Sequence, residues 1–276
     1  MLINSLGLLS KIKKGKALCA FNFSTIEVAE AIVKTAANLS VPIIIQTSQG
    51  EASFLNPEIA SSIATFLSQK YNLLLSLNLD HGQDLKMIEQ CLKAGYTSIH
   101  IDGSDLPFGE NVAITKKVVN LCQKRGASVE GEVGTVPGKS VLVQRKTEKL
   151  IMTDPKQAFQ FAKETKVDFL AVSIGETHGL EETKLQFELL NKIVRLVKLP
   201  LVLHGGSGIP KKDLEKAISF GIRKINFNTE LRLAWTEGLK KTLKSCPKEI
   251  VPYKILPASQ EAVSKVVEEK IKTCSL

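Results

Sequence analysis

The most constraining feature of the sequence is a regular alternation of short apolar runs with longer amphipathic stretches. Each run is rich in Ile, Val and Leu and has the length of a β-strand, and a segment with helical periodicity follows it. The expected strands are 17–23, 41–48, 73–80, 97–102, 128–133, 167–174, 199–205 and 224–228. The expected helices are 25–38, 57–69, 84–94, 111–124, 154–164, 186–197, 211–220 and 229–244.

Eight strand–helix units predict an α/β protein with a parallel sheet, and eight is the number that closes a (β/α)8 TIM barrel. We expect residues 1–276 to form one such domain, since a barrel of this kind takes about 250 residues. A doubly wound open sheet is the alternative architecture. The segment 252–276 is expected to add a C-terminal helix, with one apolar face formed by Ala262, Val263, Val266, Val267 and Ile271.

Several expected helices begin with a residue that favours the N-cap position. Thr25 precedes the first expected helix, and Asp154-Pro155 begins the fifth. Asn56-Pro57 places proline at a first helical position, where its missing N–H costs nothing.

The charge pattern predicts solvated helix faces and, secondarily, a preference for phosphorylated small molecules. The net charge is +9, but the lysines are spread along the chain in short pairs such as Lys13-Lys14 and Lys116-Lys117. No long basic tail and no basic run with interleaved aromatics is present, so we expect no nucleic-acid partner.

The cysteines and the hydropathy pattern predict a soluble, cytoplasmic protein without a membrane partner. The five Cys residues are widely spaced and form no C-x-x-C pair, so they are interpreted as reduced thiols. The N-terminal residues do not form a secretory signal pattern. No apolar run reaches the roughly 18 residues that a membrane-spanning helix needs.

Polar residues occupy the ends of nearly all the expected strands, where the chemistry of barrel enzymes is placed. These residues are Asn22, Ser48, Asp80, His81, Asp102, Glu130, Glu132, His178, His204, Asn226 and Asn228. Three of the four His residues are among them. Three imidazoles on one rim, with one open coordination position, predict a catalytic zinc site. The remaining histidine, His100, alternates with Ile99 and Ile101 inside a strand and is interpreted as structural.

Two loops predict a phosphate-binding site. After the seventh strand, the segment 204–208 reads His-Gly-Gly-Ser-Gly and leads into a helix near Pro210. Glycines let the backbone approach an anion, and a helix N-terminus offers free N–H groups to it. After the eighth strand, the segment 226–229 reads Asn-Phe-Asn-Thr and opens the next helix. The loops after strands seven and eight form the frequent phosphate site of this fold.

Seven segments together resemble the class II, metal-dependent fructose-bisphosphate and tagatose-bisphosphate aldolases. They run in the family order and are Ala20-Phe21-Asn22, Leu79-Asp80-His81-Gly82, Ile101-Asp102, Val129-Glu130-Gly131-Glu132-Val133-Gly134, Gly175-Glu176-Thr177-His178-Gly179, Leu203-His204-Gly205-Gly206-Ser207-Gly208 and Lys224-Ile225-Asn226-Phe227-Asn228-Thr229-Glu230.

The resemblance implies an aldolase that reversibly cleaves a ketose 1,6-bisphosphate, from fructose or tagatose, into dihydroxyacetone phosphate and glyceraldehyde 3-phosphate. It assigns the catalytic zinc to His81, His178 and His204, and a second or resting metal position to Asp102 and Glu132. Asp80 is the implied acid/base. The implied contacts of the dihydroxyacetone phosphate half are Gly179, Gly205, Gly206, Ser207, Asn226, Phe227, Asn228 and Thr229, with Asn22 and Ser48 as further substrate contacts.

The resemblance also implies a second divalent ion, a monovalent cation (Na⁺ or K⁺) beside the phosphate, and a homodimer or homotetramer. The chain departs from the family in the long loop 134–153. The family carries a Gly-Gly motif with nearby acidic residues there, one of which moves the second proton. Here the stretch 136–141 reads Val-Pro-Gly-Lys-Ser-Val, and Glu148 is the nearest later acid. The basic pair Arg145-Lys146 in this loop could reach a distal phosphate.

Two other functions fit parts of the pattern. A zinc-dependent hydrolase on the same barrel, which uses a metal-bound hydroxide, would explain the three histidines but not the paired phosphate loops. A non-catalytic phosphosugar-binding relative of the aldolases would be expected to lose metal ligands or Asp80, whereas this sequence retains them.

Overall fold

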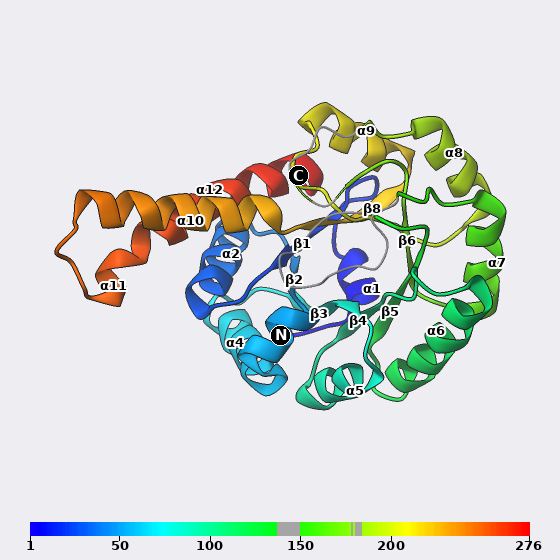
Figure 1. The fold of residues 1–276 in the computed structure, drawn as a ribbon, viewed down its shortest axis with the longest axis horizontal. Helices are drawn as coiled ribbons and strands as arrows, with labels where there is room; N and C mark the ends of the chain where they lie inside the picture. The colour runs from blue at the N-terminus through cyan, green and yellow to red at the C-terminus, as the bar shows by residue number, and fades with distance from the viewer. Residues whose placement is uncertain (137–149, 178, 180–183) are drawn as a thin grey trace.

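The computed structural model describes residues 1–136, 150–177, 179 and 184–276. Within them, parallel strands pair in chain order and β8 pairs back onto β1, so the sheet is a closed barrel with helices outside (Figure 1). The strands are β1 (Leu18–Asn22), β2 (Ile43–Ser48), β3 (Leu75–Gly82), β4 (Ser98–Ile101), β5 (Ser128–Val133), β6 (Phe169–Val172), β7 (Leu201–Leu203) and β8 (Ile222–Phe227). The predicted barrel is therefore confirmed, and the open sheet is excluded.

The predicted helices are also present, with shifts of a few residues at their ends. The helices are α1 (Ser5–Leu9), α2 (Ile26–Asn38), α3 (Gln49–Leu55), α4 (Pro57–Lys70), α5 (Leu85–Ala94), α6 (Phe108–Gln123), α7 (Pro155–Thr165), α8 (Phe187–Leu196), α9 (Lys211–Phe220), α10 (Thr229–Ser245), α11 (Pro252–Ile255) and α12 (Pro257–Cys274). The short helices α1 and α3 were not predicted, because one or two turns are too short to show a helical period.

The helix starts follow most of the predicted caps. Asp154 accepts hydrogen bonds from the backbone N–H groups of Lys156 and Gln157, and Asn56 accepts one from Glu58. Thr25 occupies the N-cap position of α2, but its hydroxyl makes no capping bond, so that part of the prediction is wrong. The predicted C-terminal helix exists as α12 and buries Val263, Val267 and Ile271 as expected, although it begins at Pro257 and not before.

The two faces of the barrel strands differ in chemistry. Side chains alternate across a strand, so one set faces the surrounding helices and the other faces the barrel interior. The outward set is apolar and joins the main hydrophobic core, as Ile43, Leu77 and Ile99 show. The inward set is largely polar and buried, as Asn78, His100 and Glu130 show. The interior is therefore an environment in which every polar group needs a partner.

Helix α1 closes the end of the barrel that lies opposite the strand C-termini. The backbone N–H of Ser5 donates to the hydroxyls of Ser98 and Ser128, at 2.9 and 3.1 Å. The Ser5 hydroxyl lies 2.9 Å from that of Ser76. This network satisfies the polar groups of the closed end, so the open end of the barrel is left for chemistry.

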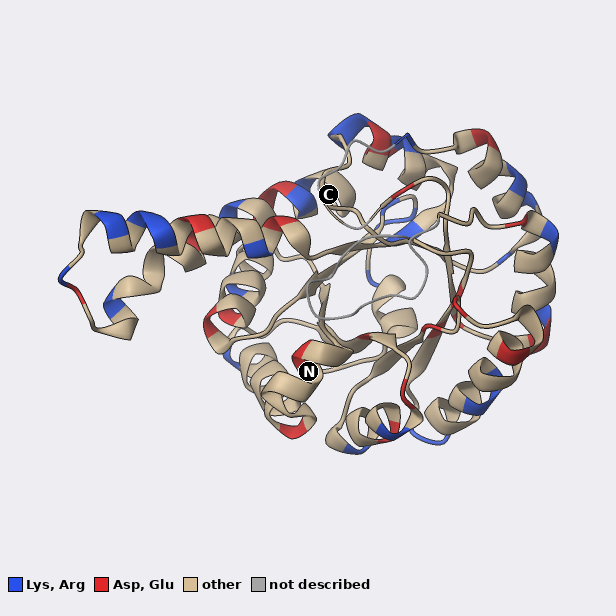
Figure 2. Cartoon of the chain, in the orientation of Figure 1, with Lys and Arg blue, Asp and Glu red and all other residues tan. Residues whose placement is uncertain are grey.

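Helices α10 and α12 pack along each other and project beyond the barrel, with α11 at their far end (Figure 1). No described helix combines the length and the apolar character needed to span a membrane. Figure 2 shows charged residues of both signs spread over the outer helices and over this projection, as predicted for solvated helix faces.

We expect Gly238→Ala to destabilise the protein, because Gly238 of α10 packs directly against the backbone of α12. A Cβ at this position would lie 2.7 Å from the Cα of Ser259 and 2.8 Å from the carbonyl oxygen of Ala258. Both are backbone atoms, so the helices must separate, at a cost of about 1–3 kcal/mol. Chemical denaturation measures this change.

The matched control is Gly109→Ala in α6, where a Cβ meets no atom within 4 Å. Since alanine favours a helix over glycine by up to about 1 kcal/mol, this variant should be neutral or stabilised. Equal effects of the two substitutions would contradict the close contact between α10 and α12.

Candidate active site

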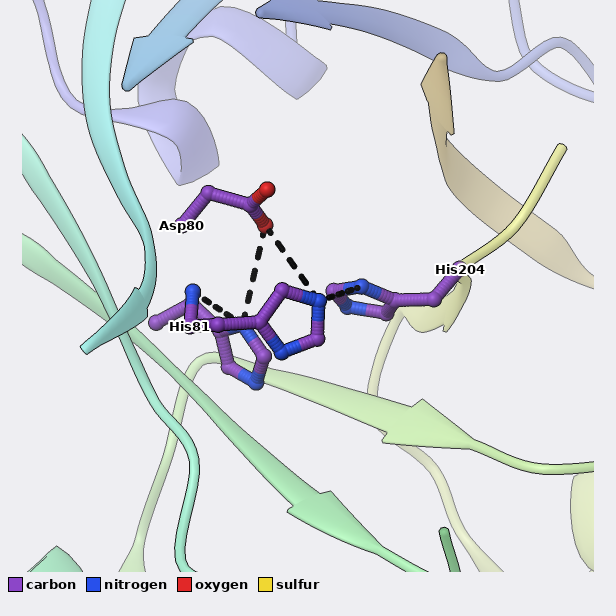
Figure 3. A group of neighbouring side chains, drawn as sticks. Asp80, His81 and His204 are labelled. Atoms are coloured by element: carbon purple, nitrogen blue, oxygen red, sulfur yellow. Dashed lines mark hydrogen bonds and ion pairs between the residues drawn. The ribbon is translucent and has the colours of Figure 1, made fainter. Parts of the chain in front are cut away.

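Three imidazole rings and one carboxylate meet at the C-terminal end of the barrel (Figure 3). The rings of His81, His100 and His204 lie with their centroids 4.6–4.7 Å apart in every pairing. Asp80 lies beside them, with Oδ1 3.9 Å from Nε2 of His81 and 3.8 Å from Nδ1 of His100. The structure thus brings together residues from β3, from β4 and from the position directly after β7, which are far apart in the sequence.

An irregularity in β3 directs two consecutive side chains to this site. In a regular strand, Asp80 and His81 would face opposite sides of the sheet. The register between β3 and β4 shifts between Leu79 and Gly82, and His81 adopts a left-handed conformation with φ 50°. A Cβ on Gly82 would lie 2.8 Å from Leu79 Cδ2, so glycine permits this turn of the chain. Bulges of this kind are frequent next to active sites, where they re-aim a side chain.

His81 and His204 are held in the manner expected of metal ligands. Nδ1 of His81 lies 2.8 Å from Asp102 Oδ2, and Nε2 of His204 lies 2.7 Å from Glu130 Oε1. The other nitrogens, His81 Nε2 and His204 Nδ1, face each other at 3.0 Å. A carboxylate on the far nitrogen leaves a lone pair on the near one, which is the arrangement of metal-binding histidines.

Two overlapping groups of side chains could hold a metal ion. The first is Asp80, His81, His100 and His204, and the second is His81, Asp102 and Glu132. Both carboxylate oxygens of Glu132 are buried and make no hydrogen bond to a described residue, although Oε2 lies 3.2 Å from His100 Nε2 and 3.7 Å from His81 Nδ1. A buried carboxylate beside convergent imidazoles fits a divalent cation. The described residues therefore fit the predicted metal positions.

The Asp80 carboxylate has the orientation and the protonation state that a general base needs. Its carboxylate accepts hydrogen bonds from Asn226 Nδ2 at 2.9 Å and from Asn22 Nδ2 at 3.2 Å. Burial opposes ionisation, but the neighbouring charges of His81, His204 and His100 hold the pKa of Asp80 well below its usual range. An ionised, oriented carboxylate can accept a proton from a substrate hydroxyl.

His100, interpreted from the sequence as structural, lies among the residues of the site. Its side chain is fully buried, and Nδ1 accepts a hydrogen bond from the backbone N–H of His81 at 3.1 Å. Nε2 lies 3.2 Å from Glu132 Oε2. The alternation with Ile99 and Ile101 was the available signal, since it places His100 on the interior face of β4.

A chain of side-chain amides orients Asn22. Asn78 Nδ2 donates to Gln46 Oε1 at 3.0 Å, and Gln46 Nε2 donates to Asn22 Oδ1 at 2.8 Å. This chain turns the Asn22 NH₂ group toward Asp80 and Glu51. Gln46 and Asn78 were not predicted, because buried amides leave no distinct signal in one sequence.

Glu51 is a further residue that was not predicted. Its Oε2 accepts from the backbone N–H of Ser48 at 2.8 Å and from Asn22 Nδ2 at 3.0 Å, and its Oε1 lies 2.6 Å from Arg232. Ser48 and Glu51 form a capping box at the start of α3. The spacing Ser-x-x-Glu is the sequence signature of this motif and could have located both the helix and Glu51.

The two predicted phosphate loops lie side by side. The N–H of Gly206 donates to the carbonyl of Asn226 at 3.0 Å, and a Cβ on Gly206 would lie 2.5 Å from Ile225 Cγ2. Gly205 has φ 61°, which favours glycine. Ser207 accepts a hydrogen bond from the N–H of Glu230 at 3.3 Å.

Of the remaining predicted residues, some lie beside the phosphate loops, one is buried, and others lie outside the described residues. Asn228 and Thr229 begin α10, whereas the Phe227 ring is buried against Phe21 and can contribute only its backbone to a ligand. Gly179 has φ 139°. His178, Glu148 and the basic pair of the long loop lie outside the described residues.

A cavity of about 420 Å³ opens beside these groups. It is bordered by Asn22, Ser48 and Asn228 from the predicted site, by Glu51, and by apolar residues that include Phe54, Leu231 and Trp235. The cavity is large enough for a small phosphorylated molecule.

We expect Glu51→Gln to lower the free energy of unfolding by about 1–3 kcal/mol, because Asn22, Ser48 and Arg232 lose their shared anionic acceptor. Urea denaturation measures the change. Glu58→Gln, on the exposed start of α4, is the matched control and should change stability little. If both variants unfold at the same denaturant concentration as the wild type, Glu51 does not hold the site together.

Comparisons with known proteins agree with this geometry. Residues 4–276 match the family model for fructose-bisphosphate aldolase class-II. The YdjI aldolase from Escherichia coli K12 is 30% identical and superposes with a TM-score of 0.85 over 99% of this chain and 97% of that one. A putative fructose-1,6-biphosphate aldolase from Coccidioides immitis is 25% identical, with a TM-score of 0.88 over 98% and 96% of the two chains.

Fructose-bisphosphate aldolase (Fba) from Campylobacter jejuni is 21% identical and shares the fold, with a TM-score of 0.84 over 99% and 95% of the two chains. The family match spans nearly the whole chain, so the fold and site define a lyase of the aldolase class. This chain belongs to the class II fructose-bisphosphate aldolase family.

Proposed function

We propose that the protein is a zinc-dependent aldolase that reversibly cleaves a ketose 1,6-bisphosphate into dihydroxyacetone phosphate and glyceraldehyde 3-phosphate. One observation carries the proposal. Two inward-facing imidazole nitrogens, His81 Nε2 and His204 Nδ1, converge at 3.0 Å beside the carboxylate of Asp80. This set combines a metal position with a base, which is what aldol cleavage requires.

Zinc is proposed to be held by His81 and His204 together with His178, with Asp102 and Glu132 forming a second position for a divalent ion. When bound, it supplies a Lewis acid that polarises the ketose carbonyl and stabilises the negative charge that develops on its oxygen. The match to the family supports metal dependence, and the buried carboxylate of Glu132 supports the second position.

Asp80 takes the proton from the C4 hydroxyl of the substrate. The resulting C4 oxygen becomes the carbonyl of the departing aldehyde as the C3–C4 bond breaks, and the bond's electron pair moves toward the C2 carbonyl. Asn22 and Asn226 hold the Asp80 carboxylate in place during this transfer. The remaining three-carbon fragment then takes a proton at the former C3.

The two glycine-containing loops are proposed to bind the phosphate of the dihydroxyacetone half. Gly205 and Ser207 provide backbone N–H groups, whereas the N–H of Gly206 is donated to Asn226 and this glycine lets the two loops approach each other. Asn228 and Thr229 lie at the start of α10. A helix N-terminus attracts an anion. Gly179 is proposed as a further contact of this phosphate, with a monovalent cation, Na⁺ or K⁺, beside it. Ser48, which lies on the cavity wall, is proposed to contact the sugar.

Purified protein loaded with zinc should release triose phosphates from fructose 1,6-bisphosphate or tagatose 1,6-bisphosphate. A chelator should abolish this release, and added zinc should restore it. The ratio of the two rates identifies the preferred sugar. Release of inorganic phosphate without triose would indicate a hydrolase, and binding of dihydroxyacetone phosphate without turnover would indicate a non-catalytic relative.

Asp80→Asn should lower kcat by roughly 10²- to 10⁴-fold, the usual contribution of a general base. The measurement should include zinc content, which must stay near the wild-type value for the loss to be assigned to proton transfer. Asp84→Asn, at the exposed start of α5, is the matched control and should keep full activity. Retention of wild-type kcat by Asp80→Asn would exclude Asp80 as the base.

We also propose that the protein is a homodimer or homotetramer. Ile250 is 85% exposed and Tyr253 is 76% exposed, and both lie near the far end of the α10–α12 projection, which a monomer leaves in solvent. Sedimentation should give a mass of two or four chains. Substituting both residues with serine should lower that mass, and a wild-type monomer would contradict the proposal.

A further inference from the structure

Lys224 is a buried cation that the proposed reaction does not use. It lies on β8, its side chain is 1% exposed, and Nζ is 2.6 Å from Oε2 of Glu130 on β5. Strands β5 and β8 are not neighbours in the barrel, so this ion pair crosses the interior. Since a buried charge is tolerated only with a partner, each of these two residues depends on the other.

The other oxygen of Glu130 contacts a proposed metal ligand. Oε1 lies 2.7 Å from Nε2 of His204. A carboxylate can only accept a hydrogen bond, so Nε2 carries the hydrogen. The carboxylate therefore joins Lys224 on one side to the His204 ring on the other.

A second contact selects the same tautomer from the opposite side of the ring. Asn226 Nδ2 lies 3.2 Å from Nδ1 of His204, and the same NH₂ group donates to Asp80 Oδ1 at 2.9 Å. The contact with Asp80 fixes the orientation of the amide, so a donor faces Nδ1 of His204. Nδ1 must then present a lone pair.

His81 has an analogous support. Its Nδ1 is held by Asp102 Oδ2, and the other oxygen of Asp102 accepts from the backbone N–H and the hydroxyl of Ser104, at 3.2 and 2.6 Å. Each ring is thus fixed by a carboxylate whose second oxygen has its own anchor. For His81 the anchor is a neutral loop residue, and for His204 it is the ammonium group of Lys224.

We propose that Lys224 is a positioning residue that acts through Glu130 to keep His204 in the tautomer with its Nδ1 lone pair facing the metal position. This inference rests on the proposed function, because it assigns His204 as a metal ligand. Removal of the ammonium group leaves the Glu130 carboxylate without its cation. The carboxylate can then no longer hold the ring in one orientation.

The test is a double-mutant cycle with zinc affinity as its main readout. Lys224→Met should weaken zinc binding by roughly 10- to 100-fold, the usual effect of removing a partner of a metal ligand. Glu130→Gln should weaken it to a similar degree. Adding Lys224→Met to Glu130→Gln should cause little further loss, because both changes break one connection. The affinities are measured by competition with a chelator.

Equal losses from Lys224→Met in both backgrounds would overturn the inference, since Lys224 would then act without Glu130. If Lys224→Met alone does not fold, comparison of Glu130→Gln with the charge-neutral double variant still decides between these outcomes. Lys270→Met is the matched control, because Lys270 is a buried lysine paired with Glu230 at 2.8 Å. It should leave zinc affinity unchanged.

The tautomer itself is read from the ¹⁵N chemical shifts of His204 in zinc-free protein. A hydrogen on Nε2 alone in the wild type, and a mixture in Lys224→Met, would support the inference. A hydrogen on Nδ1 in the wild type would overturn it. Failure of the wild type to bind zinc would reject the proposed function, while the chemical shifts would still report whether Lys224 and Glu130 control the ring.

Discussion

The ion pair between Glu130 and Lys224 is the interaction on which the arrangement of the site depends. The barrel interior excludes water from both residues, so neither charge could be placed there alone. Together they form a bridge across the interior, and the free oxygen of Glu130 fixes one imidazole of the candidate metal site. Despite burial, the neighbouring charge of Lys224 holds the pKa of Glu130 well below its usual range. The opposite charges of Glu130 and Lys224 thus compensate each other. A substitution of either residue therefore also affects the other and the His204 ring.

The bulge in β3 lets two consecutive side chains, Asp80 and His81, face the same site. An aldolase of this class needs a base and a metal ligand close together, and Asp80 and His81 are adjacent in the chain. A regular strand would send them to opposite faces. The left-handed conformation of His81 and the absence of a side chain on Gly82 bring both groups to the same cluster of candidate ligands. Residues in such conformations tend to persist at functional sites, where the surrounding contacts over-determine them. Here those contacts are the bonds of His81 to Asp102 and to His100.

Strand β8 and helix α10 connect the interior to the outer surface. Lys224 and Asn226 face the site from β8, and Asn228 begins α10, which carries Arg232 to Glu51 at the cavity wall. The same helix then continues into the projection that it forms with α12 (Figure 1). A partner subunit that contacts this projection would therefore adjoin an element that also forms part of the substrate cavity.

The sequence by itself determined the barrel, its strand order and most of the candidate site. Its eight alternating units and the polar residues at strand ends follow local rules of periodicity, which act over a few residues and are visible in one chain. Asp80, His81, Asp102, Glu132 and His204 were found in this way and lie together as expected. The tertiary structure alone decided which interior residues touch. Gln46 and Lys224 carry no local signal of function, because their roles arise from contacts with strands that are distant in sequence. Local pattern therefore specifies which face of a strand is polar, whereas closure of the barrel specifies the partners of each polar group.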